Sequence, residues 1–304
     1  MSATDGHASH TDTDDWLGRI TASKVAAILG VSPYESPRSI WHKMHGDLPR
    51  EASTTAQRRG HYLEPAILHW WADQHPTIDD WTDQPTYELG DWAAATPDRV
   101  AWLDCEHDDR RDCDQACQVL VEAKSANSLD DWGDPGTDVI PTYYLCQIFW
   151  QMHVSGVHRC YVPIIGPRLV FEEYVVDYDP AIGEDLEARM RAFHESLRAA
   201  TPPPLDDTVA TFDAIRKVHP EIDAGVEVEL DVDTAALFVA ATTGLDEAKA
   251  LDRLYRSTVI DAMGRAQYAT CRGQRIARRQ PNKTGVSFVP VAKMTDFADQ
   301  EQPA

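Results

Sequence analysis

The stretch VLVEAKSA, Val119–Ala126, begins with three apolar residues, two of them β-branched, which is typical of a strand buried in a sheet. Glu122 and Lys124 follow at once, and burying either charge costs free energy unless it has a partner. Because side chains alternate between the two faces of a strand, both charges lie on the same face as Leu120. The pattern indicates a buried strand that presents an anion and a cation on one face.

The flanking segments predict a sheet covered by helices. Strands are expected at 86–89, 92–95, 99–103, 118–124, 159–165 and 168–176, and helices at about 21–30, 40–45, 54–75, 141–154 and 179–200. Pro65 falls inside the third of these helices, where it removes a backbone hydrogen bond, so a kink or a restart is expected just after Glu64. Strands mixed with helices predict an α/β or α+β fold.

A proline-rich break, TPPPL at 201–205, predicts a domain boundary. We expect a disordered acidic tail over residues 1–15, a main domain over 16–204 and a small α+β accessory domain over 205–304. The accessory domain should contain a helix at 209–218, a strand-like segment at 225–232, a long helix at about 234–263 and a basic hairpin.

The charge of the chain is unevenly distributed. The formal net charge is -22, which counts against nucleic-acid binding as a general property of the surface. From Ala262 to Met294, however, there is no acidic residue, and the basic residues there are Arg265, Arg272, Arg275, Arg278, Arg279, Lys283 and Lys293. This segment either contacts a polyanion or forms a solvated hairpin that balances an acidic body.

Neither a secretory signal nor a membrane span is expected. The acidic first fifteen residues lack an apolar core, and no later apolar run approaches the roughly 18 residues that cross a bilayer. We therefore expect a cytoplasmic protein whose six cysteines are free thiols rather than disulfides. Cys105, His107, Cys113 and Cys117 could together hold Zn²⁺, but their irregular spacing favours free thiols on a polar hairpin.

Two more acidic residues complete a candidate site. Asp98 lies in TPDRVAW, at a turn that leads into a strand, and Glu64 lies on a helix. Mg²⁺ is typically held by one or two carboxylates together with water and substrate phosphate. A lysine on the same face can contact the attacking water or the charge that develops on phosphorus. The residues therefore predict a metal ion and a phosphodiester at this face, and the alternative for Glu122 and Lys124 is an exposed ion pair on an edge strand.

The order of the motifs resembles a known family. ITAS (Ile20–Ser23), GHYLEP (Gly60–Pro65), ATPD (Ala95–Asp98), VEAKSA (Val121–Ala126) and YYLCQIFWQMHVSG (Tyr143–Gly156) follow one another along the chain. The succession, over about residues 16–204, resembles YqaJ-type viral recombinases and phage lambda exonuclease. Both belong to the PD-(D/E)xK, or restriction-endonuclease-like, nuclease superfamily.

The resemblance implies a fold and an activity. The fold would be α/β, with a restriction-endonuclease-like core whose mixed central sheet is flanked by helices. The activity would be metal-dependent 5′→3′ digestion of linear double-stranded DNA, with two ions of Mg²⁺ or Mn²⁺. The single strands produced would serve a single-strand annealing protein in phage or prophage recombination, and the enzyme would be a ring-shaped trimer.

The resemblance also implies residue roles at the metal. Asp98, Glu122 and the backbone carbonyl of Ala123 would bind the metal, and Glu64 would complete the site. Lys124 would position or activate the attacking water.

Further residues would contact DNA or support the site. Gln147 and Tyr143 would support the catalytic residues and the scissile strand, while Ser23, Arg19 and Arg59 would contact DNA. Ser23 corresponds to a serine that binds a terminal 5′-phosphate. Arg19 directly precedes ITAS, a spacing that differs from the family pattern, and PDR stands in place of the usual PDG.

Two other functions fit the same residues. A structure- or site-specific endonuclease on the same core would nick closed circles, whereas an exonuclease requires ends. A non-catalytic DNA-binding scaffold would be free to lose one of its acidic or basic site residues. The presence of all four, Glu64, Asp98, Glu122 and Lys124, argues against the scaffold.

Overall fold

The computed structural model describes residues 17–49, 51–103, 117–283 and 285–291. The acidic tail and three of the four residues of the candidate zinc site, Cys105, His107 and Cys113, lie outside these ranges. The chain divides into two compact units, Met1–Ile222 and Asp223–Ala304. None of the described helices combines the length and the apolar character needed to cross a bilayer.

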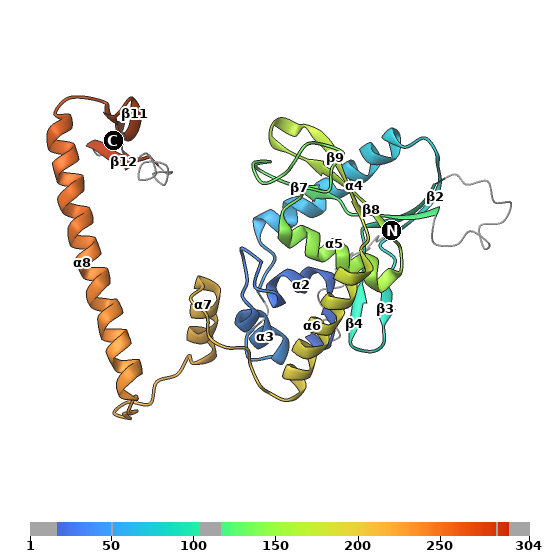
Figure 1. Ribbon diagram of the computed structural model, residues 1–304, viewed down its shortest axis with the longest axis horizontal. Helices are drawn as coiled ribbons and strands as arrows, with labels where there is room; N and C mark the ends of the chain where they lie inside the picture. Colours follow the sequence, from blue (N-terminus) through green and yellow to red (C-terminus); the bar gives the residue numbers. More distant parts are fainter. Residues whose placement is uncertain (1–16, 50, 104–116, 284, 292–304) are drawn as a thin grey trace, which may run out of the picture. The chain divides into compact units, whose positions relative to one another are not determined.

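A mixed sheet forms the centre of the first unit (Figure 1). Its strands run in the order β2 (Ile78–Asp83), β5 (Arg99–Leu103), β6 (Gln118–Val121), β8 (Arg159–Ile165) and β7 (Lys124–Ser125), and β9 (Phe171–Asp177) also pairs with β8. The pairings of β6 and β7 with β8 are parallel, and the other pairings are antiparallel. A smaller sheet contains β1 (Ile20–Thr21), β4 (Ala93–Ala95) and β3 (Tyr87–Leu89).

Helices cover this sheet on both faces. The helices of the first unit are α2 (Ala22–Ile28), α3 (Pro37–His45), α4 (Thr55–Gln74), α5 (Thr142–Ser155), α6 (Pro180–Arg198) and α7 (Val209–Val218), with a short 3₁₀ turn at Pro167–Leu169. Figure 1 shows α2 and α6 beside α5, and α3 packs against α2 and α6.

The alternation of side chains along β6 explains how the layers form. Leu120 packs into a large core with residues of α2, α5 and α6, whereas its neighbours Val119 and Val121 pack with Leu68 and Trp71 of α4. Successive strand residues point to opposite faces, so one short apolar strand joins two cores. The predicted α/β fold, a mixed central sheet flanked by helices, is confirmed.

Some local predictions were wrong. Helix α4 continues through Pro65, so of the predicted kink or restart the restart does not occur. The strand β2 was not predicted, because its sequence IDDWTD is rich in acidic residues that are depleted in strands.

The segment after the proline-rich break packs with the first unit. Helix α7 lies against α3, where the Ser36 and Thr211 hydroxyls are 2.6 Å apart, and Lys217 forms an ion pair of 2.6 Å with Glu51. The division between the units therefore falls between Ile222 and Asp223, and not at the predicted boundary after Pro204.

The second unit contains a long helix and a small sheet. Helix α8 (Val232–Met263) is followed by β10 (Tyr268–Cys271), β11 (Gln274–Asn282) and β12 (Gly285–Pro290), which form an antiparallel sheet in that order. The predicted hairpin is thus part of a three-stranded sheet. The strand-like prediction for 225–232 was wrong: residues 225–231 form no strand, their valines are exposed, and Asp231 caps α8 by accepting the Thr234 N–H.

Candidate active site

The register of two central strands brings Asp98 and Glu122 together. Strands β5 and β6 are antiparallel, and Arg99 lies opposite Val121. Asp98 directly precedes β5 and Glu122 directly follows β6, so the two carboxylates emerge at the same end of neighbouring strands. The Asp98 N–H points to Glu122 Oε2 at 3.4 Å.

The strand that carries Glu122 is interrupted at this point. Sequence predicted one strand over 118–124, but β6 ends at Val121 and β7 begins at Lys124, although both pair with β8 in the same register. In the gap, the Ala123 N–H donates to Asp98 Oδ2 at 2.8 Å. This hydrogen bond orients the Asp98 carboxylate and leaves its Oδ1 for another partner.

Glu122 is a buried charge with several donors. Its side chain is only 4% exposed. Oε1 accepts from Lys124 Nζ at 2.6 Å and from Gln147 Nε2 at 2.5 Å, and Oε2 accepts from Gln151 Nε2 at 2.8 Å. These partners offset the cost of burying the carboxylate. The Glu122–Lys124 pair is therefore not an exposed edge-strand ion pair.

Lys124 remains a cation in this environment. Burial alone lowers the pKa of Lys124, but the charges of Glu122 and Asp98 outweigh that effect, and its pKa lies above the usual value. Its ammonium also lies 3.3 Å from Gln147 Oε1 and 5.0 Å from the centre of the Tyr144 ring. Lys124 is thus placed to act as a charged hydrogen-bond donor rather than as a base.

The surroundings disfavour the charged form of Asp98, whereas they favour that of Lys124. Burial and the nearby charges of Glu122 and Glu64 raise its pKa well above the usual value, and the Lys124 charge and the Ala123 hydrogen bond only partly compensate. Carboxylates that repel one another in this way are the arrangement that a divalent cation would stabilise.

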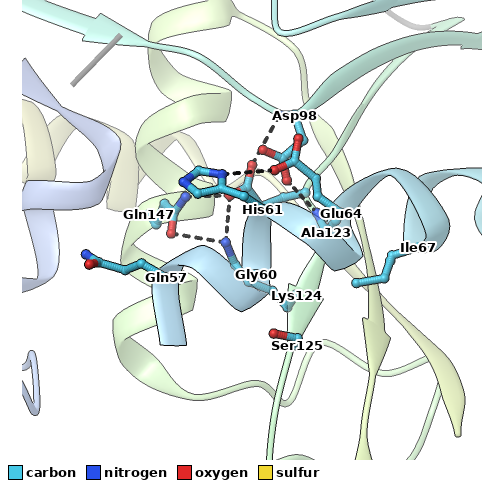
Figure 2. Close-up of a pocket in the computed structure, with 11 residues that line it drawn as sticks. Gln57, Gly60, His61, Glu64, Ile67, Asp98, Ala123, Lys124, Ser125 and Gln147 are labelled. Carbon is cyan, nitrogen blue, oxygen red and sulfur yellow. Dashed lines mark hydrogen bonds and ion pairs between the residues drawn. The ribbon is translucent and has the colours of Figure 1, made fainter. Parts of the chain in front are cut away.

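These groups line one pocket, with a volume of about 330 Å³. Figure 2 shows Asp98 and Glu64 beside each other, with Lys124 and Gln147 close by. All six residues predicted for catalysis or metal binding line it: Glu64, Asp98, Glu122, Ala123, Lys124 and Gln147. Glu64 reaches the pocket from α4, where it accepts from Gln84 Nε2 at 3.2 Å and lies 3.8 Å from His61 Nδ1.

The pocket fits a hard divalent cation that needs only a few protein ligands. Within the described ranges, no three Asp, Glu, His or Cys side chains are already arranged as a metal cluster. Mg²⁺ does not need such a cluster, because one or two carboxylates with water and substrate oxygens suffice. Asp98, Glu122 and the carbonyl of Ala123 could provide oxygen ligands, and Glu64 could join directly or through water.

The residues predicted to contact DNA do not line this pocket. Ser23 is exposed in the first turn of α2, and Arg59 is exposed on α4. Arg19 forms an ion pair with Glu88. Tyr143 packs against Tyr144 with the two rings tilted and their centres 4.2 Å apart, and the Tyr144 ring in turn contacts the ammonium of Lys124.

Several site residues were missed from sequence. Gln151 is fully buried against Glu122, and Gln57 and His61 line the pocket from α4. The sequence pattern that could have indicated Gln151 is its spacing of four residues from Gln147, which places both side chains on one face of a helix. Gln84 approaches from the β2–β3 turn, for which the sequence offers no comparable pattern.

The chain was compared with solved structures, with curated proteins and with family models. Similar solved structures include an alkaline exonuclease from Laribacter hongkongensis (20% identity, 62% of this chain and 94% of that chain, TM-score 0.47). The same exonuclease in complex with dAMP matches with 21% identity, 62% and 92% coverage and a TM-score of 0.45. A phage-related exonuclease from Haemophilus somnus 129PT matches with 9% identity, 60% and 94% coverage and a TM-score of 0.42.

Among curated proteins, no significant match is found. Residues 14–158 match the family model of the YqaJ-like viral recombinase domain, and this range includes the whole pocket from Gln57 to Gln147. The family predicted from the ordered motifs is confirmed. The first unit contains a YqaJ-like viral recombinase domain.

Proposed function

We propose that the protein is a metal-dependent exonuclease that digests linear double-stranded DNA in the 5′→3′ direction. The observation that carries the proposal is the joint placement of Asp98, Glu122 and Lys124 in one pocket of a YqaJ-like viral recombinase domain. The buried carboxylate of Glu122, the partly buried carboxylate of Asp98, which a backbone N–H orients, and a neighbouring ammonium are suited to hydrolysis of a phosphodiester.

Each residue has a defined task in this proposal. Asp98, Glu122 and the Ala123 carbonyl hold Mg²⁺ or Mn²⁺, with Glu64 as a further ligand. The metal's contribution at such a site is polarisation of the phosphate and a lower pKa for water. The Lys124 ammonium orients the attacking water and stabilises negative charge that develops on the phosphate oxygens.

The glutamines act on these groups rather than on the substrate. Gln147 donates to Glu122 and accepts from Lys124, so it holds both side chains in their relative positions. Gln151 fixes the second oxygen of Glu122 from the interior. An exonuclease has to repeat one geometry at every nucleotide, and a pre-ordered arrangement of charges lowers the reorganisation needed at each step.

The proposed biological setting is taken from the family resemblance. The single strands that remain after 5′→3′ digestion would be bound by a single-strand annealing protein during phage or prophage recombination in the host cytoplasm. Ser23, Arg19, Arg59 and Tyr143 would guide the DNA end toward the pocket, and a ring-shaped trimer would keep the enzyme on one strand.

Digestion of defined DNA substrates tests the proposal. The substrates are a linear duplex labelled at its 5′ end, the same duplex labelled at its 3′ end, and a covalently closed circle. Early release of the 5′ label in Mg²⁺ or Mn²⁺, with none in EDTA and no attack on the circle, is the expected result. Nicking of the circle would instead indicate an endonuclease, and DNA binding without cleavage in either metal would indicate a scaffold.

A further inference from the structure

The sheet of the second unit carries a concentration of positive charge in an acidic protein. Over the described residues from 262 to 291, the sequence contains no Asp or Glu, although the whole chain has 50 acidic residues against 28 Lys and Arg. The basic residues of this stretch are Arg265, Arg272, Arg275, Arg278, Arg279 and Lys283. Such segregation concentrates a positive potential in this unit.

Strand register places two of these arginines on one face with an aromatic ring. Tyr268 pairs with Arg278, and Thr270 pairs with Arg275 beyond a bulge in β11. Directly paired residues on neighbouring strands have their side chains on the same face. Arg275 and Arg278 are exposed, and the Arg275 guanidinium lies 4.0 Å from the centre of the Tyr268 ring. We call Tyr268, Arg275 and Arg278 the basic face.

The opposite face of the sheet is occupied by the rest of its own unit. Ala277 is buried, Arg279 donates to the carbonyl of Gly264 just after α8, and Phe288 lies 5.9 Å from the Arg256 guanidinium of α8. The sheet therefore turns one side toward α8 and presents the basic face on its other side.

A tight turn extends the basic face at one end. Residues 272 and 273 connect β10 and β11, with φ of 49° at Arg272 and 81° at Gly273. A two-residue turn with both φ angles positive matches the twist of a β-hairpin, and the glycine tolerates it readily. The turn adds a third arginine next to the paired strands.

We propose that the basic face binds the phosphodiester backbone of DNA, as a second contact separate from the pocket of the first unit. This inference rests on the proposed function only because it takes DNA as the polyanion. Guanidinium groups bind phosphate oxygens through paired N–H donors, and an aromatic ring beneath one of them restricts its orientation and can stack with an unpaired base. The duplex and the single strand share this backbone chemistry.

Salt-dependent binding of the full-length protein in EDTA tests the proposal without cleavage. Fluorescence anisotropy is measured with a labelled duplex and with a labelled single strand. The test variant is Arg275→Gln/Arg278→Gln, and the control is Lys249→Gln/Arg253→Gln, which removes the same charge from exposed positions on α8. Circular dichroism melting confirms that both variants remain folded.

The expected result is a change in the salt slope. Each phosphate contact contributes about 0.9 to the slope of log K against log salt for a duplex and about 0.7 for a single strand. The test variant should lose about 1.8 of this slope with a duplex, or about 1.4 with a single strand, whereas the control should keep the wild-type slope. The DNA form that shows the loss identifies the source of the phosphates.

Several outcomes would overturn the proposal. These are equal slopes for the test variant and the wild type on both DNA forms, equal losses in the test variant and the control, and no binding of the wild type to either DNA. A slope change with polyglutamate but with neither DNA would assign the basic face to an acidic protein. Failure of cleavage in a separate Mg²⁺ assay, with the salt slopes as expected, would contradict the proposed function and leave this inference intact.

Discussion

The backbone N–H of Ala123 donates a 2.8 Å hydrogen bond to Asp98 Oδ2, and this bond links the ends of two antiparallel strands. It forms because β6 stops after Val121, so the Ala123 N–H is released from the ladder and turned toward the neighbouring carboxylate. The same interruption leaves Glu122 and Lys124 in contact at 2.6 Å. One break in one strand thus assembles most of the candidate site.

Replacement of Lys124 should remove cleavage and retain DNA binding. The ammonium is the cation nearest to Glu122, and removing a group that stabilises charge in a transition state costs about 100-fold or more in rate. We expect at least this loss in Lys124→Ala, measured as release of labelled nucleotides in Mg²⁺. Lys217→Ala removes a lysine from an exposed ion pair on α7 and should cleave at the wild-type rate. Activity of Lys124→Ala within a few-fold of wild type would remove Lys124 from the proposed chemistry.

Asp98→Asn should stabilise the metal-free protein while abolishing cleavage. Burial and the charges of Glu122 and Glu64 raise the Asp98 pKa, so its ionised form opposes folding. The corresponding stability is present below the unfolded pKa of about 3.9 and is lost as pH rises through the folded value. In EDTA the Tm of Asp98→Asn should therefore exceed that of wild type near pH 7, and the gain should shrink as the pH falls toward about 4.

The effect of metal on the Tm of Asp98→Asn is a second test. A ligand that binds only the folded state raises Tm, so Mg²⁺ or Mn²⁺ should raise the Tm of wild type and have little effect on Asp98→Asn. An equal rise in both proteins would place the metal elsewhere.

The two glutamines of α5 should differ in their effect on stability. Gln151 is 1% exposed and its Nε2 donates to Glu122, whereas Gln147 is only partly buried. Loss of a donor to a buried charge costs about 1.5–3 kcal/mol, so Gln151→Met should lower the free energy of unfolding by this amount. Gln147→Met should cost less, because water can reach the vacated position. Urea unfolding in EDTA measures both, and the reverse order would contradict the described roles.

The loop before α7 should make a pH-dependent contribution to stability. Burial alone raises the pKa of Asp206, but hydrogen bonds from the Thr208 hydroxyl and N–H and from the Thr211 hydroxyl outweigh it, so the pKa is lowered. Such a group stabilises the fold above its unfolded pKa, and the effect is lost as pH falls through the folded value. Asp206→Asn should lower Tm at pH 7 and have no effect at acidic pH. Asp207→Asn, one residue further, is the control and should match wild type at both pH values.

The core could be predicted from local alternation, and the candidate site from the resemblance of the ordered motifs to a known family. Apolar alternation around Leu120 placed the central strand, and the motif order placed Glu64, Asp98, Glu122 and Lys124 in one site. The interruption at Ala123 could not be predicted, because it depends on a hydrogen bond to a residue 25 positions away.

Two differences between the predicted and the observed elements arise from tertiary contacts. The prolines at 202–204 marked a break in the chain, yet α7 beyond them packs on α3 through Ser36 and Thr211. The alternating segment 225–230 has the period of a strand, but a strand requires a paired neighbour, and this segment has none within the described unit. Periodicity alone cannot provide that partner.

The most direct test of the central proposal is the digestion of one linear duplex, labelled at its 5′ or its 3′ end, by wild type and Lys124→Ala in Mg²⁺ and in EDTA. The account predicts that wild type releases the 5′ label first, requires Mg²⁺ and leaves a closed circle intact, and that Lys124→Ala releases neither label. First release of the 3′ label would contradict the proposed polarity, and cleavage that persists in EDTA or in Lys124→Ala would contradict the proposed chemistry of the pocket.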